Sequence, residues 1–130
     1  MSEFVILFHQ MPDDRERTDH WDLMIQSEQS LITWALDSPP TVGTVASGVR
    51  LEDHRIEYLD FEGSVSGNRG NVRQIARGRC QWIACLETQK KVRLFGADFV
   101  WWVTIDESDP QSVAVRFESC SDQSPSEVSN

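Results

Sequence analysis

The stretch that decides the fold is HWDLMI, residues 20–25, in which large apolar side chains alternate with a polar or smaller set. Successive side chains of an extended chain point to opposite faces, so the tryptophan, leucine and isoleucine share one face. Three large apolar side chains on one face predict the core side of a β-strand. His20 and Asp22 then project together from the opposite face, close enough to share one ligand.

Similar runs, rich in β-branched and aromatic residues, fill most of the chain and are separated by turn signals such as Ser38-Pro39-Pro40 and Asp109-Pro110. No amphipathic helix longer than about ten residues accompanies them. The pattern predicts an all-β fold, a small closed or partly open antiparallel β-barrel with little helix. The predicted strands are Glu3–Gln10, Trp21–Gln26, Leu31–Leu36, Val45–Leu51, Val72–Ala76, Cys80–Leu86, Val92–Phe95, Phe99–Ile105 and Ser112–Phe117.

The last residues differ in composition from the rest. Residues 118–130, ESCSDQSPSEVSN, contain serines and acidic residues but no basic residue. Such a segment buries little apolar surface and is typical of a disordered terminus. We therefore expect one domain over residues 1–117 and a disordered Ser-rich acidic tail over residues 118–130.

Composition excludes several classes of protein. The chain has 130 residues, of which 39% are hydrophobic, enough for one core. No apolar run approaches the ~20 residues of a membrane span, and the N-terminus lacks the basic region of a secretory signal. The three cysteines are an odd number without a C-x-x-C motif, which argues against a disulfide framework or a Cys-based zinc site. We expect a cytoplasmic protein with no membrane partner.

Charge is distributed unevenly along the chain. The net charge is −9, yet the segment Arg69–Arg93 alone carries +6. A protein that binds nucleic acid by bulk charge alone would not be built this way. A local basic strip is compatible with a small or end-specific phosphate ligand, and equally with a solvated face on edge strands. Both interpretations stay open.

The histidines point to a candidate metal site. His9 closes the first predicted strand, immediately before a polar loop over residues 11–19. Together with His20 and Asp22 it makes two imidazoles and one carboxylate, a set that leaves coordination positions open on a divalent metal. The alternative interpretation is a surface His–Asp pair beside a core strand.

A second cluster lies in VRLEDHRIEYLDFEG, residues 49–63, where charged and apolar residues alternate. His54 and Tyr58 share parity, but four residues of extended chain separate them by ~13 Å. Both could therefore reach one ligand only if the segment bends. The alternative interpretation is an edge strand that carries salt bridges.

Together these motifs resemble the 3′-phosphoesterase domain of bacterial DNA ligase D, a domain also found as a stand-alone protein. That family has a strand ending in His, a His-x-Asp strand, a Ser/Thr-Trp-Ala strand and a Glu-Asp-His…Glu-Tyr…Phe-Glu-Gly signature. The similarity extends over residues 4–105. The matching segments are Phe8-His9, residues 20–23, residues 32–36, residues 49–63 and residues 77–82.

The resemblance implies a metal-dependent hydrolase that trims 3′-phosphate or 3′-ribonucleotide ends in DNA repair. It implies that His9, His20 and Asp22 hold Mn²⁺ or another divalent metal. It also implies that His54 and Tyr58 contact the phosphate or assist proton transfer, so that all five residues serve catalysis. The expected partners are a nucleic-acid 3′ end or another phosphate ester, with a ligase or repair polymerase acting alongside.

The chain departs from the family at three basic positions, which fall at Met24, near Ser38 and near Ala46. A methionine supplies neither charge nor a hydrogen-bond donor, so it cannot bind a phosphate as the family's basic residue does. Arg15 or Arg17 on the long loop is the candidate replacement. These departures favour an alternative function, a catalytically weak or inactive relative that binds nucleic-acid ends or a repair partner.

A third hypothesis is a non-haem iron oxygenase, because two histidines and one carboxylate also describe that iron site. Its ligands here would be His20, Asp22 and His54. The Glu-Asp-His…Phe-Glu-Gly string has no reason to exist in that class of enzyme, so the hypothesis ranks below the other two.

Overall fold

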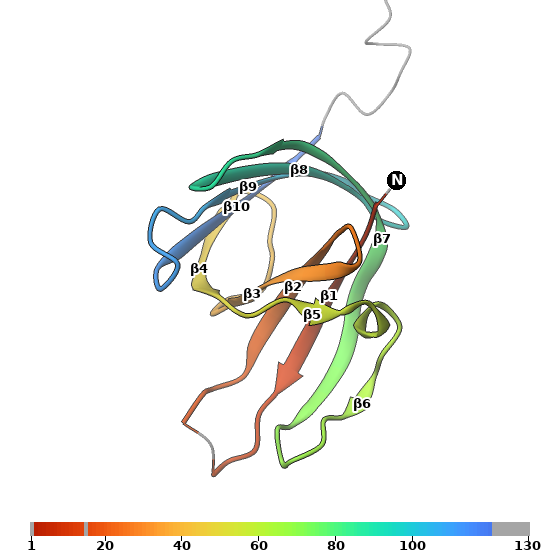
Figure 1. Ribbon diagram of the computed structural model, residues 1–130, viewed down its shortest axis with the longest axis vertical. Coiled ribbons are helices and arrows are strands. Elements are labelled where there is room, and N and C mark those ends of the chain that lie inside the picture. Colours follow the sequence, from red (N-terminus) through yellow and green to blue (C-terminus); the bar gives the residue numbers. More distant parts are fainter. Residues whose placement is uncertain (1, 15, 121–130) are drawn as a thin grey trace, which may run out of the picture.

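Eight antiparallel strands close into a barrel in the computed structural model, which describes residues 2–14 and 16–120 (Figure 1). Around the barrel the order is β1-β2-β3-β4-β10-β9-β8-β7, and β7 pairs back with β1. The predicted all-β class with little helix is confirmed. The barrel strands are β1 (Ser2–Gln10), β2 (His20–Ser27), β3 (Ser30–Leu36), β4 (Thr44–Arg50), β7 (Asn71–Cys85), β8 (Gln89–Phe95), β9 (Val100–Asp106) and β10 (Val113–Ser119).

Three short elements lie outside the barrel wall. They are β5 (His54–Arg55), which pairs with β3, the 3-10 helix η1 (Ile56–Leu59), and β6 (Gly63–Ser64), which pairs with β7. This covering segment crosses the outer side of the barrel in front of β1, β2 and β3 (Figure 1). Within the described part of the chain, no helix has the length and apolar character that a membrane crossing requires.

The prediction of two strands at Val72–Ala76 and Cys80–Leu86 is wrong, because β7 runs through both without a break. Its first part pairs with β1 and its second part with β8, so one long strand closes the barrel. Gly78 lies where the two partners meet, and a Cβ there would lie 2.0 Å from the carbonyl oxygen of Phe95. The glycine marks a close approach of two backbones rather than a turn.

The predicted domain boundary at residue 117 falls too early. Strand β10 continues to Ser119, and Cys120 is buried, with its backbone N–H donating to the carbonyl of Val100 at 2.9 Å. Pairing with β9 therefore extends order beyond the last apolar residue of the strand. The remainder of the predicted tail, residues 121–130, lies outside the described residues.

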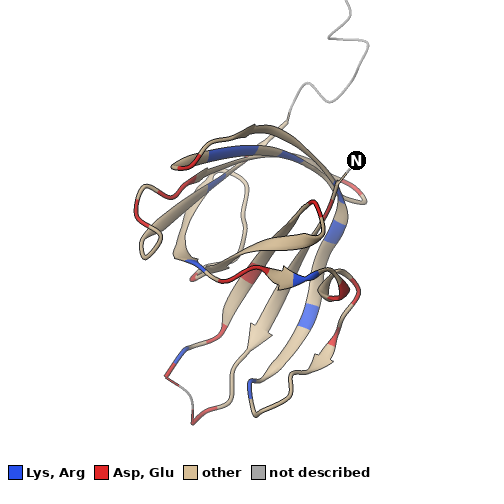
Figure 2. Cartoon of the chain, in the orientation of Figure 1, with Lys and Arg blue, Asp and Glu red and all other residues tan. Residues whose placement is uncertain are grey.

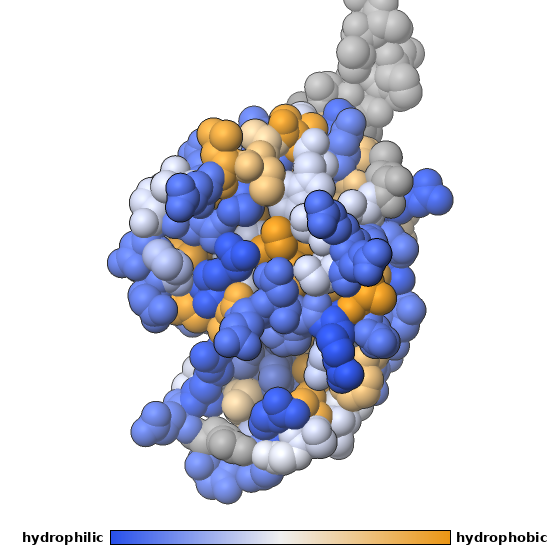
Figure 3. All heavy atoms as spheres, viewed as in Figure 1, coloured by the Kyte–Doolittle hydropathy of each residue, from blue (hydrophilic) through white to orange (hydrophobic). Residues whose placement is uncertain are grey.

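Two apolar clusters share the strands of this barrel. The inner cluster fills the barrel and includes Phe4, Ile6 and Leu23. The outer cluster lies between the barrel wall and the covering segment, and it includes Val5 and Leu7. Strand β1 is thus buried on both faces, which explains its near-continuous apolar sequence. Hydrophilic residues cover most of the molecular face seen in Figure 3.

Candidate metal centre

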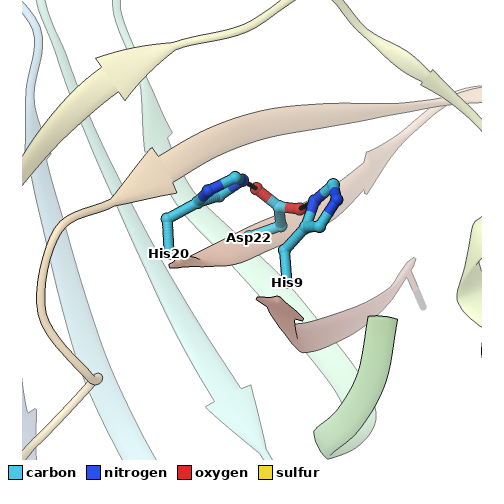
Figure 4. A group of neighbouring side chains, drawn as sticks. All are labelled: His9, His20 and Asp22. Carbon is cyan, nitrogen blue, oxygen red and sulfur yellow. Dashed lines mark hydrogen bonds and ion pairs between the residues drawn. The ribbon is translucent and has the colours of Figure 1, made fainter. Parts of the chain in front are cut away.

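His9, His20 and Asp22 converge on the outer side of the barrel, at the ends of β1 and β2 (Figure 4). The register of this hairpin places His9 directly opposite His20, and Asp22 is the next residue of β2 on the same face. One ligand atom from each residue lies within 4.8 Å of the others. The predicted trio is therefore gathered by strand pairing alone.

The carboxylate of Asp22 lies between the two imidazoles, with one oxygen facing each ring (Figure 4). Oδ2 is 3.1 Å from Nδ1 of His9, and Oδ1 is 3.2 Å from Nε2 of His20. Burial raises the pKa of Asp22, but its interactions with the two imidazoles outweigh burial and hold that pKa below the ordinary value. The site thus keeps a buried carboxylate in its charged form.

Both histidines are anchored through their other ring nitrogen. His9 Nε2–H donates to the carbonyl of Arg69 at 2.6 Å, and His20 Nδ1–H donates to the carbonyl of Thr18 at 2.9 Å. Such second contacts fix the tautomer and the orientation of metal-binding imidazoles. They leave Nδ1 of His9 and Nε2 of His20 turned toward Asp22 as the available ligand atoms.

The turn before β7 is what brings the Arg69 carbonyl to His9. Gly70 has a φ of +93°, and a Cβ at this position would lie 2.1 Å from the carbonyl oxygen of Gln10. Any other residue would therefore push this turn away from the end of β1. On the other side, the backbone N–H of Met11 donates to Asp19 Oδ1 at 2.8 Å, which closes the loop between the two histidines.

The residues present fit a divalent metal. Asp22 Oδ1 is buried and accepts no hydrogen bond from any described residue, although a buried charged oxygen normally has several partners. Two imidazole nitrogens and one carboxylate match the ligand preferences of first-row divalent ions and leave open positions. The donor set does not by itself select manganese over iron or zinc.

Arg17 is the cation beside this centre. It lines a surface hollow together with His20, Asp37 and Val49, and it forms no ion pair with any described residue. Its charge also acts against protonation of His9, whose pKa is nevertheless raised. Burial lowers that pKa, while the contacts with Asp22 and the Arg69 carbonyl more than offset burial.

At two of the three positions where the family has a basic residue, this chain has a buried apolar residue. Met24 is buried in the outer cluster and Ala46 in the inner cluster. Neither position offers a polar contact to a ligand at the metal centre. Arg15, the other loop arginine predicted as a replacement, lies outside the described residues.

His54 and Tyr58 form a second group. The 3-10 helix η1 supplies the bend that a shared contact requires, and their ring centroids are 5.3 Å apart. His54 pairs with Leu31 of β3, whereas Asp22 pairs with Ala35, four residues farther along that strand. This offset corresponds to ~13 Å along the sheet. The strand register therefore gathers His54 with Tyr58 rather than with the trio.

Two contributors to the centre have no sequence signal. The carbonyl groups of Thr18 and Arg69 orient the imidazoles, but any residue type carries a carbonyl. The nearest hint is Gly70, whose conformation lets the second carbonyl approach. No family model matches the chain and no curated protein matches it, so the functional argument rests on these residues and their geometry.

Proposed function

We propose that this chain is a divalent-metal-dependent phosphoesterase, similar to the 3′-phosphoesterase domain of DNA ligase D, that acts on a 3′-phosphate or 3′-ribonucleotide end. The observation that carries the proposal is the trio with its buried His20 and Asp22, in which both imidazoles are anchored to carbonyls and turn their free nitrogens to one carboxylate. Structural His–Asp pairs have no need of this arrangement. Manganese is the expected ion.

In this proposal, His9, His20 and Asp22 hold the ion. A bound divalent ion supplies Lewis-acid polarisation of a phosphoryl oxygen and lowers the pKa of a bound water. Arg17 binds the substrate phosphate, because its guanidinium pairs with no carboxylate of the described residues and lines the hollow that His20 also lines. The walls of that hollow orient the ester toward the trio.

His54 and Tyr58 serve the part of the substrate beyond the reacting phosphate. Their rings face the same outer side of the barrel as the trio, and an imidazole and a phenol both donate hydrogen bonds to phosphate or sugar oxygens. Nδ1–H of His54 donates to the carbonyl of Glu52 at 3.0 Å, which leaves Nε2 available for a ligand.

A second candidate function is end binding without turnover. The burial of Met24 favours it, because the family's cationic side chain at this position is replaced by one that packs in the outer cluster. With the −9 net charge, such a relative would use a local site rather than bulk attraction to bind nucleic acid.

The test compares the wild type with Asp22→Asn and with Asp98→Asn, an equal charge change at an exposed position. Calorimetry measures Mn²⁺ binding, and the same samples are assayed for release of phosphate from an oligonucleotide with a 3′-phosphate. We expect binding and release in the wild type and in Asp98→Asn, and neither in Asp22→Asn.

Other outcomes separate the alternatives. Metal binding without release from 3′-phosphate or 3′-ribonucleotide ends would favour the end-binding relative. Oxygen uptake with Fe²⁺ in place of phosphate release would favour the iron oxygenase. No binding of any divalent ion would overturn the metal centre itself.

A further inference from the structure

The outer face of β8, β9 and β10 lies across the barrel from the metal centre and carries several cations. In the closed order of strands, β9 is four strands away from β2 in either direction. Strand register places Lys91, Thr104 and Arg116 in one row across this face, and Arg93, Trp102 and Glu118 in the next row. We call Lys91, Arg93, Trp102 and Arg116 the cationic face; Figure 2 shows its basic residues on β8.

Trp102 holds two of these cations in place. Lys91 Nζ and the guanidinium carbon of Arg93 each lie 4.8 Å from the centroid of its ring. Arg93 also lies 5.5 Å from the ring of Phe95. Cation–π contacts restrict long flexible side chains, so the entropy cost of ordering them on a ligand is reduced.

These cations have no carboxylate partner among the residues that the structure describes. Within the described part of the chain, Lys91, Arg93 and Arg116 form no ion pair, and Arg93 Nε is buried without any hydrogen-bond partner. This is unexpected in a protein with 21 acidic and 12 basic residues. A guanidinium that aromatic rings hold in place, and whose terminal nitrogens form no ion pair with the described residues, is well suited to phosphate, which accepts two parallel hydrogen bonds.

The arrangement of the cations favours a chain of phosphates over a single one. Lys91 and Arg93 are two residues apart on one strand, ~6.6 Å, and Arg116 lies two strands away, ~10 Å. The face thus presents separated positive charges beside the half-buried rings of Trp102 and Phe95, and positive charges combined with aromatic rings are typical of surfaces that bind single-stranded nucleic acid. The acidic Glu118 next to Trp102 limits the attraction for anions that lack this spacing.

We propose that the cationic face is a second nucleic-acid contact, which binds the phosphates of a single strand through Lys91, Arg93 and Arg116. The contact does not depend on the proposed phosphoesterase activity or on the metal. An acidic protein can bind nucleic acid in this way, because the phosphates are attracted to one patch and not to the protein as a whole. Two residues of the basic strip in the sequence, Lys91 and Arg93, belong to this face.

The experiment measures fluorescence anisotropy of a labelled single-stranded oligothymidylate without a 3′-phosphate, with EDTA present. Wild type, Arg93→Gln, Lys91→Gln and Arg73→Gln are compared at several salt concentrations. Arg73→Gln is the matched control, because Arg73 is also an arginine over a phenylalanine, 5.7 Å from the ring of Phe8, on another part of the barrel. Thermal melting checks that each variant is folded.

We expect Arg93→Gln to weaken binding by about tenfold, as removal of a charge-assisted hydrogen bond does. The slope of log affinity against log salt should fall by ~0.7 for each phosphate that the variant no longer binds, also in Lys91→Gln. Arg73→Gln should bind as the wild type does. This pattern of results would support nucleic-acid binding at the cationic face even if the protein bound no metal at the trio.

Three results would overturn the proposal. The first is that the wild type does not bind the oligonucleotide. The second is that Arg73→Gln weakens binding as much as Arg93→Gln. The third is that inorganic phosphate or polyglutamate, at the same concentration of charge, displaces the strand completely, since the face would then be a general anion site.

Discussion

Two carboxylates are buried in this barrel, and their surroundings differ in a way that separates structure from function. The side chains of Asp22 and Glu107 are 4% and 3% exposed. Both have a pKa held below the ordinary value, although burial alone would raise it. What differs is the kind of partner that keeps each one charged.

Glu107 is surrounded by a lysine, an arginine and an indole N–H. It pairs with Lys90 Nζ, which is itself buried, and accepts hydrogen bonds at 3.1 Å from Arg50 Nη1 and at 3.1 Å from Trp34 Nε1. All three of these partners are supplied by the protein, so this network is complete without a ligand. It links β3, β4 and β8 to the end of β9 and belongs to the fold.

Asp22 has two imidazoles instead, and a neutral imidazole nitrogen can also bind a metal ion. One of its oxygens accepts no hydrogen bond from the described residues. The protein therefore supplies three partners to Glu107 but leaves one oxygen of Asp22 without a hydrogen bond from the described residues. Burial of a carboxylate therefore does not by itself mark a functional site. A missing hydrogen-bond partner, or partners that can also bind a metal ion, are the sign of one.

The largest expected effect comes from breaking the complete network. Glu107→Gln leaves the buried Lys90 without an anion, and such a change typically costs about 3–5 kcal/mol of stability. Urea unfolding followed by circular dichroism measures the decrease. Glu87→Gln, the same change at an exposed position, should lie within about 0.5 kcal/mol of the wild type.

The double variant Lys90→Met/Glu107→Leu sharpens this result. Apolar residues of similar volume often replace a buried ion pair at little cost, so most of the stability should return. Equal stability of Glu107→Gln and wild type would show that the Glu107 network does not support the fold.

The second largest effect is a stabilisation of the fold by bound Mn²⁺. At a Mn²⁺ concentration one hundred times Kd, binding should raise the free energy of unfolding of the wild type by about 2.7 kcal/mol. Asp22→Asn should show no such increase, because the incomplete carboxylate is gone. Thermal melting with and without Mn²⁺ measures the difference.

Glu107→Gln tests whether the two carboxylates are independent. It should keep the metal-induced increase despite its low stability, since Glu107 belongs to the other network. If Mn²⁺ raised the free energy of unfolding of Asp22→Asn as much as that of the wild type, the metal would bind elsewhere and Asp22 would not mark a functional site.

The smallest effect is on pH dependence. Because the pKa of Glu107 is lowered from 4.5 in the folded protein, its stabilising contribution is present above that value and is lost as pH falls through the folded-state pKa. Unfolding free energies measured from about pH 6 down to about pH 3 should therefore fall less steeply in Glu107→Gln than in the wild type. Parallel curves would contradict the lowered pKa.

Local alternation predicts much of the fold and the core of the site. The stretch over residues 20–25 has one apolar face, and Leu23 and Ile25 do lie in the inner cluster while Asp22 faces outward. The mixed parity of His9 with Val5 and Leu7 is harder to interpret. Both faces of β1 are buried, so no clean polar face exists there.

Long-range contacts account for the predictions that failed or stayed open. Gly78 resembles a strand break in the sequence, but it allows β7 to pass close to Phe95. The separation of His54 from Asp22 depends on which residue of β3 each one pairs with. The network around Glu107 joins residues up to 73 positions apart and has no local pattern.

The sequence by itself determined the strand class, the inward and outward faces of β2, and the pairing of a histidine with an aspartate on one of them. These follow from a side-chain period of two, which is a property of the local chain. The tertiary structure adds the contact between His9 and Asp22, the carbonyls that anchor both imidazoles, and the cations that form no ion pair with the described residues. Those outcomes depend on strand register and barrel closure, and register is fixed by packing between segments distant in the chain.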